Sequence, residues 1–448
     1  MAPFDLRLVA FLLLTTLPVP ALAGDVSVKL DSGAGFSVKD NTGAVERLRV
    51  DVATGNVSRN GALFVHTTGT NNTFVGVSAG STSTTGSGNA GFGRLSLRSN
   101  TTGTANAAFG NEALYSNTAG SYNAACSAAA LRANTTGNWN SAVGFRALFL
   151  NSTGSENSAF GAFALVANTA SSNSAFGMLT LASNTTGTSN TAVGSGALTS
   201  NTTGLDGSAV GVDALRNNTT GWKNSALGTA ALRSNTTGSY NTALGTYALQ
   251  FNTNVSNTAV GYAALRNGTT GSRNAALGKD AGSNQTTGND NIYLANTGVA
   301  GENQQIKIGT VGTHTQTTIA GISGATSSGG VAVLVNASGV LGTTTSSARF
   351  KQDVRDMGDA SDVLMKLRPV VFRYREDVVG AEDSKQTQYG LIAEEVEQVA
   401  PELVAPDLEG KPYSVKYHEL PALLLNELQQ QRQEIAALRE RLAKLEAR

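Results

Sequence analysis

The sequence of 448 residues carries 32 basic and 32 acidic side chains, so its formal net charge is zero, and only 14% of it is charged. With 51 glycines, this is not the composition of an ordinary globular enzyme, and zero net charge gives no electrostatic argument for a nucleic-acid or membrane-surface partner. Three scattered histidines predict no metal site, nothing indicates a cofactor, and a single cysteine excludes an intrachain disulfide.

Residues 1–23 have the pattern of a secretory signal peptide. Arg7 supplies a basic start, residues 8–17 are apolar, and Ala21-Leu22-Ala23 is a small-x-small cleavage site. The apolar run is too short to span a bilayer, and no other stretch is long enough. We therefore expect the mature chain to begin near Gly24, to have no membrane span, and to be secreted or held at the cell surface.

Residues 24–70 predict a small β cap or neck. Phe36–Lys39, Leu48–Asp51 and Leu63–His66 alternate apolar and polar residues, and turns rich in Gly and Asn separate them. Such a cap covers the end of a repeating coil that would otherwise be exposed.

Residues 71–288 are dominated by a repeat of the form N-[ST]-A-[VFL]-G-x-x-A-L-x-x-N-T-T-G, seen for example from Asn190 to Gly204. Successive copies are 17 residues apart, except for two steps of 16 residues. A fixed period this short predicts a parallel β-solenoid, in which each repeat is one rung stacked on the last. About twelve rungs at β-strand spacing give a shaft of roughly 55–60 Å. The marker residue of each rung is Gly93, Gly110, Ser127, Gly144, Gly161, Gly177, Gly194, Gly211, Gly228, Gly245, Gly261 or Gly278.

The residue types at each position of the repeat predict the conformation and the packing of one rung. The residue before the marker glycine, such as Phe109 or Val143, is the one large side chain of a short strand, so we expect it to pack inside. An Ala-Leu pair such as Ala197-Leu198 is expected to bury a second side, either as strand or as a single helical turn. Glycines that close N-T-T-G turns, such as Gly204, are expected to use a positive φ.

Each rung thus offers about two sizeable apolar side chains, too few to hold a lone chain against its conformational entropy. Three chains that share an axial core would not have this difficulty, so we predict a homotrimer. A heteromeric or a membrane-packed array would explain the thin core equally. Cys126 replaces the large residue in one rung and is expected in the core, with a bond between protomers as the alternative.

The N-T-T triplets are glycosylation acceptors in form. A repeated turn with stacked Asn side chains is the simpler interpretation, because a motif match alone is weak.

Residues 289–345 predict an irregular β neck. Four short runs are typical of strands broken by glycines, at Ile292–Leu294, Ile306–Gly309, Thr317–Gly321 and Val331–Val335. After residue 346 the composition becomes charged and mixed, which is typical of a compact α/β or α+β domain.

Four ordered motifs follow between Ser346 and about Leu428. They are S-S-A-R-F-K from Ser346, L-R-P-V-V-F-R-Y from Leu367, G-L-I-A-E-E-V from Gly390, and P-E-L-V from Pro401 followed by Y-H-E-L from Tyr417. The series resembles the C-terminal intramolecular chaperone and auto-processing domain of phage tail spikes and fibres, first associated with endosialidases. The repeat array is also loosely similar to the head repeats of trimeric autotransporter adhesins, although the period differs.

The resemblance implies that the chain cuts itself between Thr345 and Ser346, with Ser346 as nucleophile and Lys351 as its base. Any enzyme activity would then be that of a single-turnover serine-lysine endopeptidase. A neutral lysine can activate a serine hydroxyl, and a spacing of five residues lets a turn bring the two together. The alternative is a Thr/Ser-rich linker followed by an ordinary surface lysine. Ser347 replaces the family's usual Asp, a departure that would slow or abolish cleavage without removing the chaperone role.

Residues 423–448 predict a coiled-coil helix. The two seam positions of its heptads are filled by Leu428, Ile435 and Leu442, and by Leu424, Gln431, Leu438 and Leu445. A mixed Ile/Leu seam suits a trimer. An amphipathic helix packed on its own domain is the alternative.

The sequence therefore predicts a mainly β chain with a trimeric parallel solenoid shaft of 17-residue repeats, a small α+β chaperone domain at 346–422 and a terminal coiled coil. We expect an exported, bacterial, tail-fibre-like homotrimer whose C-terminal domain directs assembly. One alternative is an adhesin that binds a glycan or a cell surface through scattered aromatics, namely Tyr122, Trp139, Trp222, Tyr240 and Tyr262.

A third class, a spike enzyme that degrades polysaccharide, requires two carboxylates close together. The acids of the array are sparse. Glu156 and Asp206 are three rungs apart, and only Asp206 and Asp213 fall within one rung.

Overall fold

The protein is described by a computed structural model over residues 35–39, 46–322 and 327–447. The expected signal peptide lies outside these ranges. The chain divides into two compact units, residues 1–314 and 315–448. Within the described ranges, no helix is both long enough and apolar enough to cross a membrane.

Unit 1 begins with an antiparallel meander at the end of the solenoid. Its strands are β1 (Phe36–Lys39), β2 (Glu46–Val50), β3 (Val57–Arg59) and β4 (Ala62–His66). β4 pairs antiparallel with β5 (Thr73–Val75), the first strand of the solenoid.

His66 closes this end of the coil. Its ring lies 4.9 Å from that of Phe74, and both side chains are buried. Nε2 of His66 donates to the Ala79 carbonyl oxygen at 2.6 Å.

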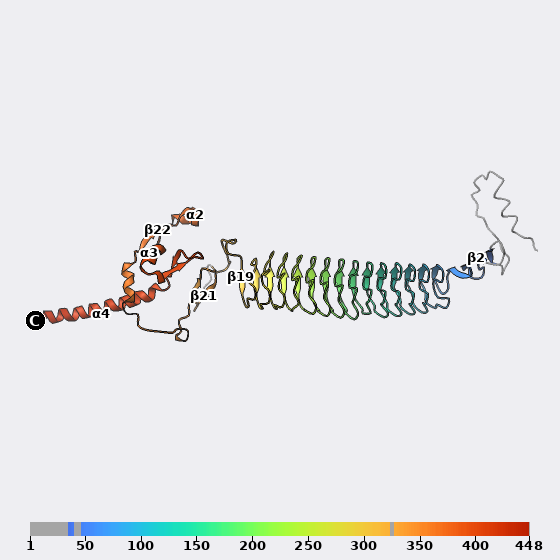
Figure 1. Cartoon of the computed structure of the whole chain (residues 1–448), viewed down its shortest axis with the longest axis horizontal. Coiled ribbons are helices and arrows are strands. Elements are labelled where there is room, and N and C mark those ends of the chain that lie inside the picture. The colour runs from blue at the N-terminus through green and yellow to red at the C-terminus, as the bar shows by residue number, and fades with distance from the viewer. Residues whose placement is uncertain (1–34, 40–45, 323–326, 448) are drawn as a thin grey trace, which may run out of the picture. The chain divides into compact units, whose positions relative to one another are not determined.

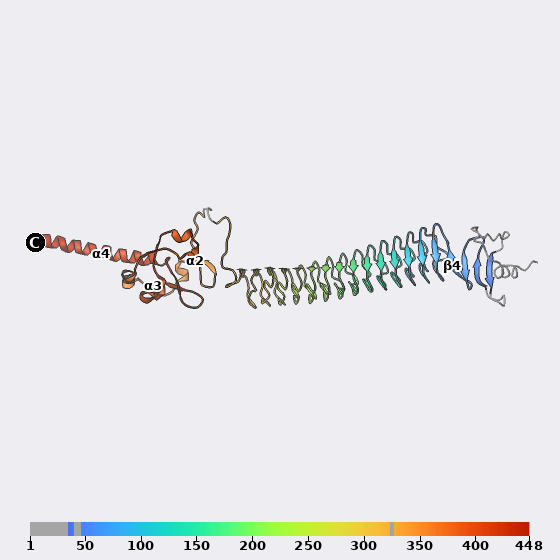
Figure 2. The same ribbon diagram turned by 90° about the horizontal axis from the view of Figure 1, so that it is seen from above.

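Strands β5 to β19 form one continuous parallel ladder, which confirms the predicted β-solenoid. Figures 1 and 2 show their arrows in a single row along the coil. Pairing is residue for residue, as where Ala159 of β10 faces Ala175 of β11. The ladder continues past residue 288 into the segment that was expected to be an irregular neck. Its remaining strands are β6 (Ala90–Phe92), β7 (Ala107–Phe109), β8 (Ala124–Cys126), β9 (Ser141–Val143), β10 (Ser158–Phe160), β11 (Ser174–Phe176), β12 (Thr191–Val193), β13 (Ser208–Val210), β14 (Ser225–Leu227), β15 (Thr242–Leu244), β16 (Thr258–Val260), β17 (Ala275–Leu277), β18 (Ile292–Leu294) and β19 (Ile306–Ile308).

The interior of each rung differs from the prediction. The middle alanine of the strand is buried, as at Ala108, whereas the large third residue points outward, with Phe109 44% and Val143 40% exposed. The expectation that this large residue packs inside was wrong, and so was the expected burial of Cys126, which is exposed. Since side chains alternate along a strand, a three-residue strand sends its first and third residues to one face and only the second to the other.

The Ala-Leu pair fills the space opposite the buried alanine. Both side chains are buried, as at Ala113 and Leu114, but the segment is a tight turn and neither strand nor helix. The leucine takes a left-handed conformation, with φ of 52° at Leu114 and 50° at Leu198. That conformation costs roughly 1–2 kcal/mol. Burying the leucine side chain contributes roughly 1.5–3 kcal/mol, which offsets it.

Glycine is needed in the N-T-T-G turn for space, not for a positive φ as expected. A Cβ on Gly204 would lie 2.4 Å from the Asn201 side-chain oxygen and 2.5 Å from the Gly221 carbonyl oxygen of the next rung. The marker glycines combine both demands. Gly110 has φ of 143°, and a Cβ there would lie 2.5 Å from the Ser127 carbonyl oxygen.

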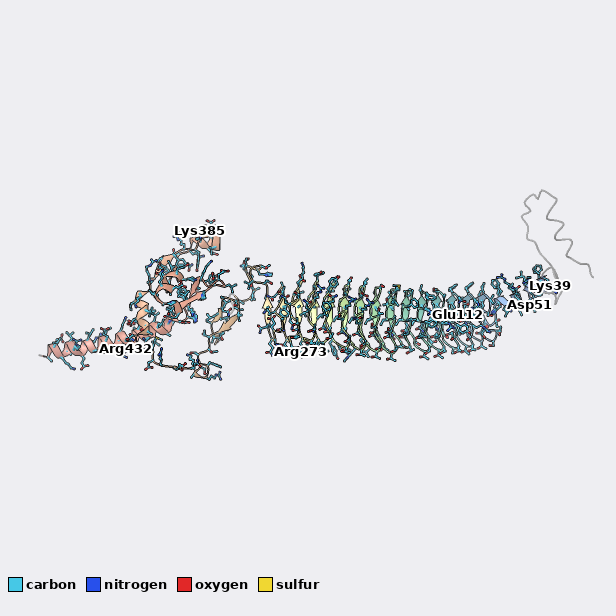
Figure 3. The ribbon with its side chains drawn as sticks, in the orientation of Figure 1. Lys39, Asp51, Glu112, Arg273, Lys385 and Arg432 are labelled. Carbon is cyan, nitrogen blue, oxygen red and sulfur yellow. The ribbon has the colours of Figure 1, made fainter. Side chains whose placement is uncertain are left out.

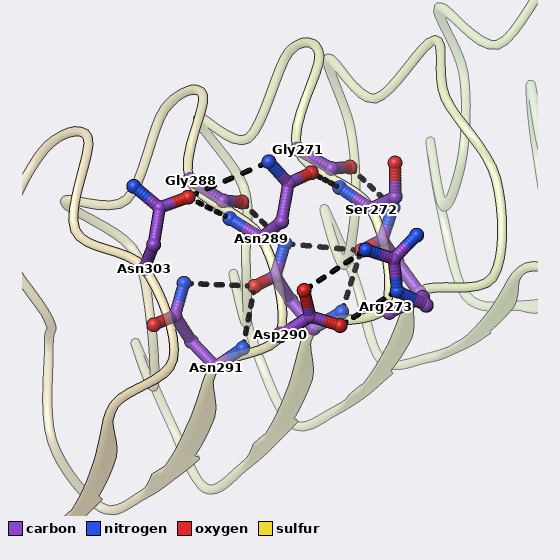
Figure 4. Close-up of polar contacts among 10 residues, drawn as sticks. Gly271, Ser272, Arg273, Gly288, Asn289, Asp290, Asn291 and Asn303 are labelled. Carbon is purple, nitrogen blue, oxygen red and sulfur yellow. Dashed lines mark hydrogen bonds and ion pairs between the residues drawn. The ribbon is translucent and has the colours of Figure 1, made fainter.

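Two columns of buried asparagines run along the coil, which confirms the stacked-turn interpretation of the N-T-T triplets. In the strand-side ladder, Asn291 donates its backbone and side-chain N–H groups to Asn274 Oδ1, both at 3.0 Å (Figure 4). The members of this ladder are Asn72, Asn89, Asn106, Asn123, Asn140, Asn157, Asn173, Asn190, Asn224, Asn241, Asn257, Asn274 and Asn291. The turn-side ladder contains the triplet asparagines Asn100, Asn117, Asn134, Asn151, Asn168, Asn184, Asn201, Asn218, Asn235 and Asn252.

Unit 2 is a small α+β region, as predicted. Its strands pair as three hairpins, β20 (Val333–Val335) with β21 (Leu341–Thr343), β22 (Val370–Phe372) with β23 (Gln388–Gly390), and β24 (Val404–Pro406) with β25 (Pro412–Val415). The strand expected at Thr317–Gly321 is not formed. The helices are α2 (Glu376–Val379), α3 (Ala393–Val399) and α4 (Leu420–Glu446), with 3-10 turns η1 (Ala348–Phe350), η2 (Gly358–Lys366), η3 (Asp383–Lys385) and η4 (Pro401–Leu403).

The core of unit 2 is small. α3 packs on the β24–β25 hairpin through five buried residues, which are Val396, Ala400, Leu403, Val404 and Val415. The first turns of α4 hold η2, since Asn426 Nδ2 donates to Ser361 Oγ at 2.7 Å and to the Gly358 carbonyl oxygen at 2.8 Å.

Candidate functional site

The two predicted catalytic residues lie next to each other in unit 2. Lys351 Nζ donates to Ser346 Oγ at 3.5 Å, and the single turn η1 between them brings the side chains together. Ser347, the residue that replaces the family's Asp, precedes this turn in an extended conformation. The spacing of five residues therefore allows the two side chains to form a hydrogen bond across one turn.

The surroundings of this pair are open. Both side chains are exposed to solvent. A lysine acts as a general base only in its neutral form, which burial favours. The single chain brings the predicted nucleophile and the predicted base within hydrogen-bonding distance, but it does not bury them as the predicted chemistry requires.

The other family motifs assemble into one folded body. The Tyr417 hydroxyl accepts a hydrogen bond from the Leu391 backbone N–H at 2.9 Å, which joins the Y-H-E-L stretch to the G-L-I-A-E-E-V stretch. Arg368 Nε donates to Glu395 Oε2 at 3.0 Å and joins the L-R-P-V stretch to α3. The hydrogen bond from Arg368 holds the pKa of Glu395 below its ordinary value. These contacts explain why the motifs occur together in the sequence.

An apolar pocket of about 470 Å³ opens between β22, β23 and the start of α4. The sequence analysis did not predict it, although most of its walls are motif residues. The motifs alternate large apolar side chains with Pro and Gly, and this pattern was the feature of the sequence that could have indicated a pocket. The lining residues are Leu364, Leu367, Pro369, Val370, Val371, Tyr389, Gly390, Leu391, Tyr417, Leu420 and Leu424. A wall without a charged group suits packing against another apolar surface rather than acid–base chemistry.

The helix α4 leaves its seam open. Leu428, Ile435, Leu438 and Leu442 are each at least 50% exposed. The pocket and this seam share Leu424, so one apolar surface runs from the pocket onto the helix. The coiled coil itself stays a prediction.

The aromatic residues of the shaft gather in pairs. Tyr122 and Trp139 stack with ring centroids 4.0 Å apart and planes 4° apart, and they are 50% and 59% exposed. Trp222 and Tyr240 meet edge to face, with Lys223 Nζ 4.9 Å from the Trp222 ring centroid.

Several acids of the shaft form ion pairs at its surface. Glu112, which is labelled on the shaft in Figure 3, has its Oε2 2.7 Å from Arg132 Nε. Asp213 Oδ2 lies 3.3 Å from Arg216 Nη1. Among the described residues, no group of three His, Cys, Asp or Glu side chains could hold a metal ion.

Comparison with known families identifies the C-terminal region. Residues 346–405 match the family described as chaperone of endosialidase, which confirms the resemblance inferred from the motifs. No curated protein and no solved structure matches the chain. The matched segment starts at Ser346, the residue placed beside Lys351.

Proposed function

We propose that this chain, a β-solenoid followed by a chaperone-of-endosialidase segment, is an exported homotrimeric fibre whose C-terminal unit directs assembly and then cuts itself free. The observation that supports it most is the contact between Ser346 and Lys351 at the first residue of the matched segment. Export rests on the signal-peptide pattern of residues 1–23.

Apolar surfaces that the single chain leaves exposed to solvent support a role in assembly. The pocket beside β22 and β23 and the seam of α4 are apolar surfaces on the unit that resembles a chaperone. In a parallel solenoid the repeats are nearly alike, so threading copies together risks errors of register. A unit that trimerises at one end sets that register before the shaft forms.

The placement of Ser346 beside Lys351 supports the proposed cleavage. Its Oγ attacks the carbonyl carbon of Thr345 while Lys351 takes the hydroxyl proton, and the peptide bond between Thr345 and Ser346 is replaced by an ester between the same residues. The proton passes to the released Ser346 amine. Water then hydrolyses the ester and leaves a Thr345 carboxylate and the free Ser346 hydroxyl. Burial of the pair in the trimer would favour the neutral lysine that the first step needs.

Intact mass and denaturing gels, with and without boiling, test this proposal. The wild-type chain is expected to give a fragment that ends at Thr345, whereas Ser346→Ala and Lys351→Ala stay full length. Ser384→Ala, which changes a half-buried serine of the same unit away from Lys351, is the control and should be cut like the wild type. A wild-type chain that stays intact after assembly would show that the cutting step is wrong.

The stacked Tyr122–Trp139 pair supports a second candidate function, binding of a glycan. A flat exposed aromatic surface suits the apolar face of a sugar ring. A glycan array with the wild type and with Tyr122→Ala/Trp139→Ala distinguishes this function. Signals lost in the double variant favour an adhesin, and an array without any signal rejects it.

A further inference from the structure

A column of large apolar side chains runs along the outer face of the solenoid sheet. Each of the fifteen strands from β5 to β19 contributes its third residue. Several are well exposed, such as Phe109 at 44%, Leu227 at 49% and Leu277 at 54%. The members of this outer column are Val75, Phe92, Phe109, Cys126, Val143, Phe160, Phe176, Val193, Val210, Leu227, Leu244, Val260, Leu277, Leu294 and Ile308.

The face that carries the outer column has no charged residue. The first residue of each of these strands shares the face, and it is Thr, Ser or Ala in every strand but the last two, where it is Ile292 and Ile306. The face of a sheet that is exposed to water normally carries polar and charged side chains. Neighbouring members of the column instead stack on one another, as Phe92 and Phe109 do with centroids 5.1 Å apart.

The area of the outer column is that of an interface. Fifteen side chains of this size and exposure amount to on the order of 1,000 Å² of apolar surface, whereas one partner in a standard stable interface buries about 800 Å². The small first residues beside the column allow another surface to approach closely. Any partner must be apolar along the whole solenoid and must match its rung spacing.

We propose that copies of this chain meet along the outer column, parallel and in register, so that each strand level packs the same residue from every protomer. The proposal rests on the homotrimer proposed above and adds the face through which it forms. A second copy has the same rung spacing, including both shortened rungs, and its own apolar column. An assembly directed from the C-terminal unit places the copies in the same direction. Packed in this way, the large residue of each rung joins a core shared between chains.

Cys126 provides a direct test, because it is a member of the outer column and is exposed in the single chain. The purified full-length protein is treated with a thiol-reactive maleimide, and its oligomeric state is measured separately by light scattering. In the trimer, labelling of Cys126 is expected to be lost until the protein is denatured. A second set carries Cys126→Ser with either Val210→Cys in the column or Thr203→Cys on an exposed turn. Only the Thr203→Cys protein should be labelled in its native state.

The possible results distinguish a failure of the proposed interface from a failure of the proposed homotrimer. A trimer in which Cys126 and Val210→Cys react as fast as Thr203→Cys overturns the proposed face and leaves the homotrimer standing. A folded monomer with a reactive Cys126 overturns both. A protein that light scattering finds monomeric, but whose Cys126 becomes protected when lipid vesicles are added, shows a membrane as the partner and also contradicts the proposal.

Discussion

Buried asparagine joins one rung to the next. Asn140 donates its backbone N–H and its side-chain N–H to Asn123 Oδ1, both at 3.0 Å, and donates again to the Gly154 carbonyl oxygen at 2.9 Å. A buried amide is tolerated only when its hydrogen bonds are satisfied. The two ladders therefore fix the register of the coil, because their hydrogen bonds are directional. The apolar contacts of the buried alanines and leucines are not directional and do not fix the register in this way.

The turn-side ladder is broken at Gly268, which occupies the asparagine position between Asn252 and Gln285. Gln285 Oε1, on the far side of the break, is buried, and the described structure offers it no hydrogen-bond partner. It lies 3.7 Å from the position that a Cβ on Gly268 would take. A Cβ on Gly268 would meet its nearest atom, the Leu265 carbonyl oxygen, at 3.3 Å, and its φ is not positive.

Gly268→Asn is expected to stabilise the solenoid by about 1 kcal/mol, because it supplies a missing link of the ladder and removes a glycine from the unfolded ensemble. The thermal unfolding midpoint measures the effect. Gly110→Asn is the control and should destabilise the protein strongly, because its φ is 143° and its Cβ would overlap the next rung. Equal midpoints for Gly268→Asn and the wild type would mean that the ladder adds nothing at this point.

At the scale of elements, the C-terminal end of the solenoid is closed by an ion pair. Tyr293 of β18 is buried, and Lys307 of β19 donates from Nζ to Glu302. Burial raises the pKa of Tyr293 above its ordinary value. Burial also works to raise the pKa of Glu302, but hydrogen bonds from Lys307 and the Val299 N–H outweigh it, and the net pKa lies below the ordinary value of 4.5.

This ion pair predicts a weakness in acid. Because the pKa of Glu302 is lower in the folded protein, its contribution to stability is present above pH 4.5 and is lost as the pH falls through the folded value. The wild type should therefore lose more stability than Glu302→Gln on acidification below pH 4.5. Thermal unfolding midpoints of both proteins as a function of pH measure this. Parallel curves would contradict the assigned role of Glu302.

Helix α4 gives a second prediction at this scale. Ile435 lies on the predicted seam and is 50% exposed, and its neighbour Glu434 lies off the seam. Ile435→Lys should weaken trimer formation, since a charge in a coiled-coil seam must be desolvated, whereas Glu434→Lys should not. Light scattering over a dilution series compares them. Equal dissociation of both variants would favour a helix packed on its own unit.

At the scale of the whole molecule, the shaft and its C-terminal unit have different roles. A chain that ends at Thr345 is expected not to form trimers when it is produced alone, because nothing sets the register of its copies. The full-length Ser346→Ala chain should form trimers and keep its C-terminal unit. Light scattering and gel analysis report both outcomes. A truncated chain that assembles as well as the full-length one would show that the shaft needs no such guidance.

Periodicity predicted the architecture well, because a fixed step of 17 residues leaves few alternatives to a solenoid. The N-terminal strands and the Asn stacks could also be predicted from the sequence pattern. The pairing of Ser346 with Lys351 was implied by the resemblance of the motifs to a known family, and the five-residue spacing is only compatible with it. The direction of the large strand residue could not, since a three-residue strand is too short for its alternation to show which face is inside. The left-handed backbone conformation of the leucines could not be predicted either. Leucine rarely adopts a positive φ, and only the burial of its side chain explains why it does so in this protein.

The N-T-T-G turns have a consequence for how such a molecule changes its length over evolution. At Gly204 the backbone of the next rung comes so close that no side chain fits, and the two Asn ladders link most of the rungs. A duplication of one complete repeat preserves all of these contacts and lengthens the molecule by about 4.8 Å. An insertion of half a repeat would move the asparagines of every later rung out of their columns. Related proteins should accordingly differ by whole repeats, with small deletions confined to the turn, as at Ala170 and Asn254.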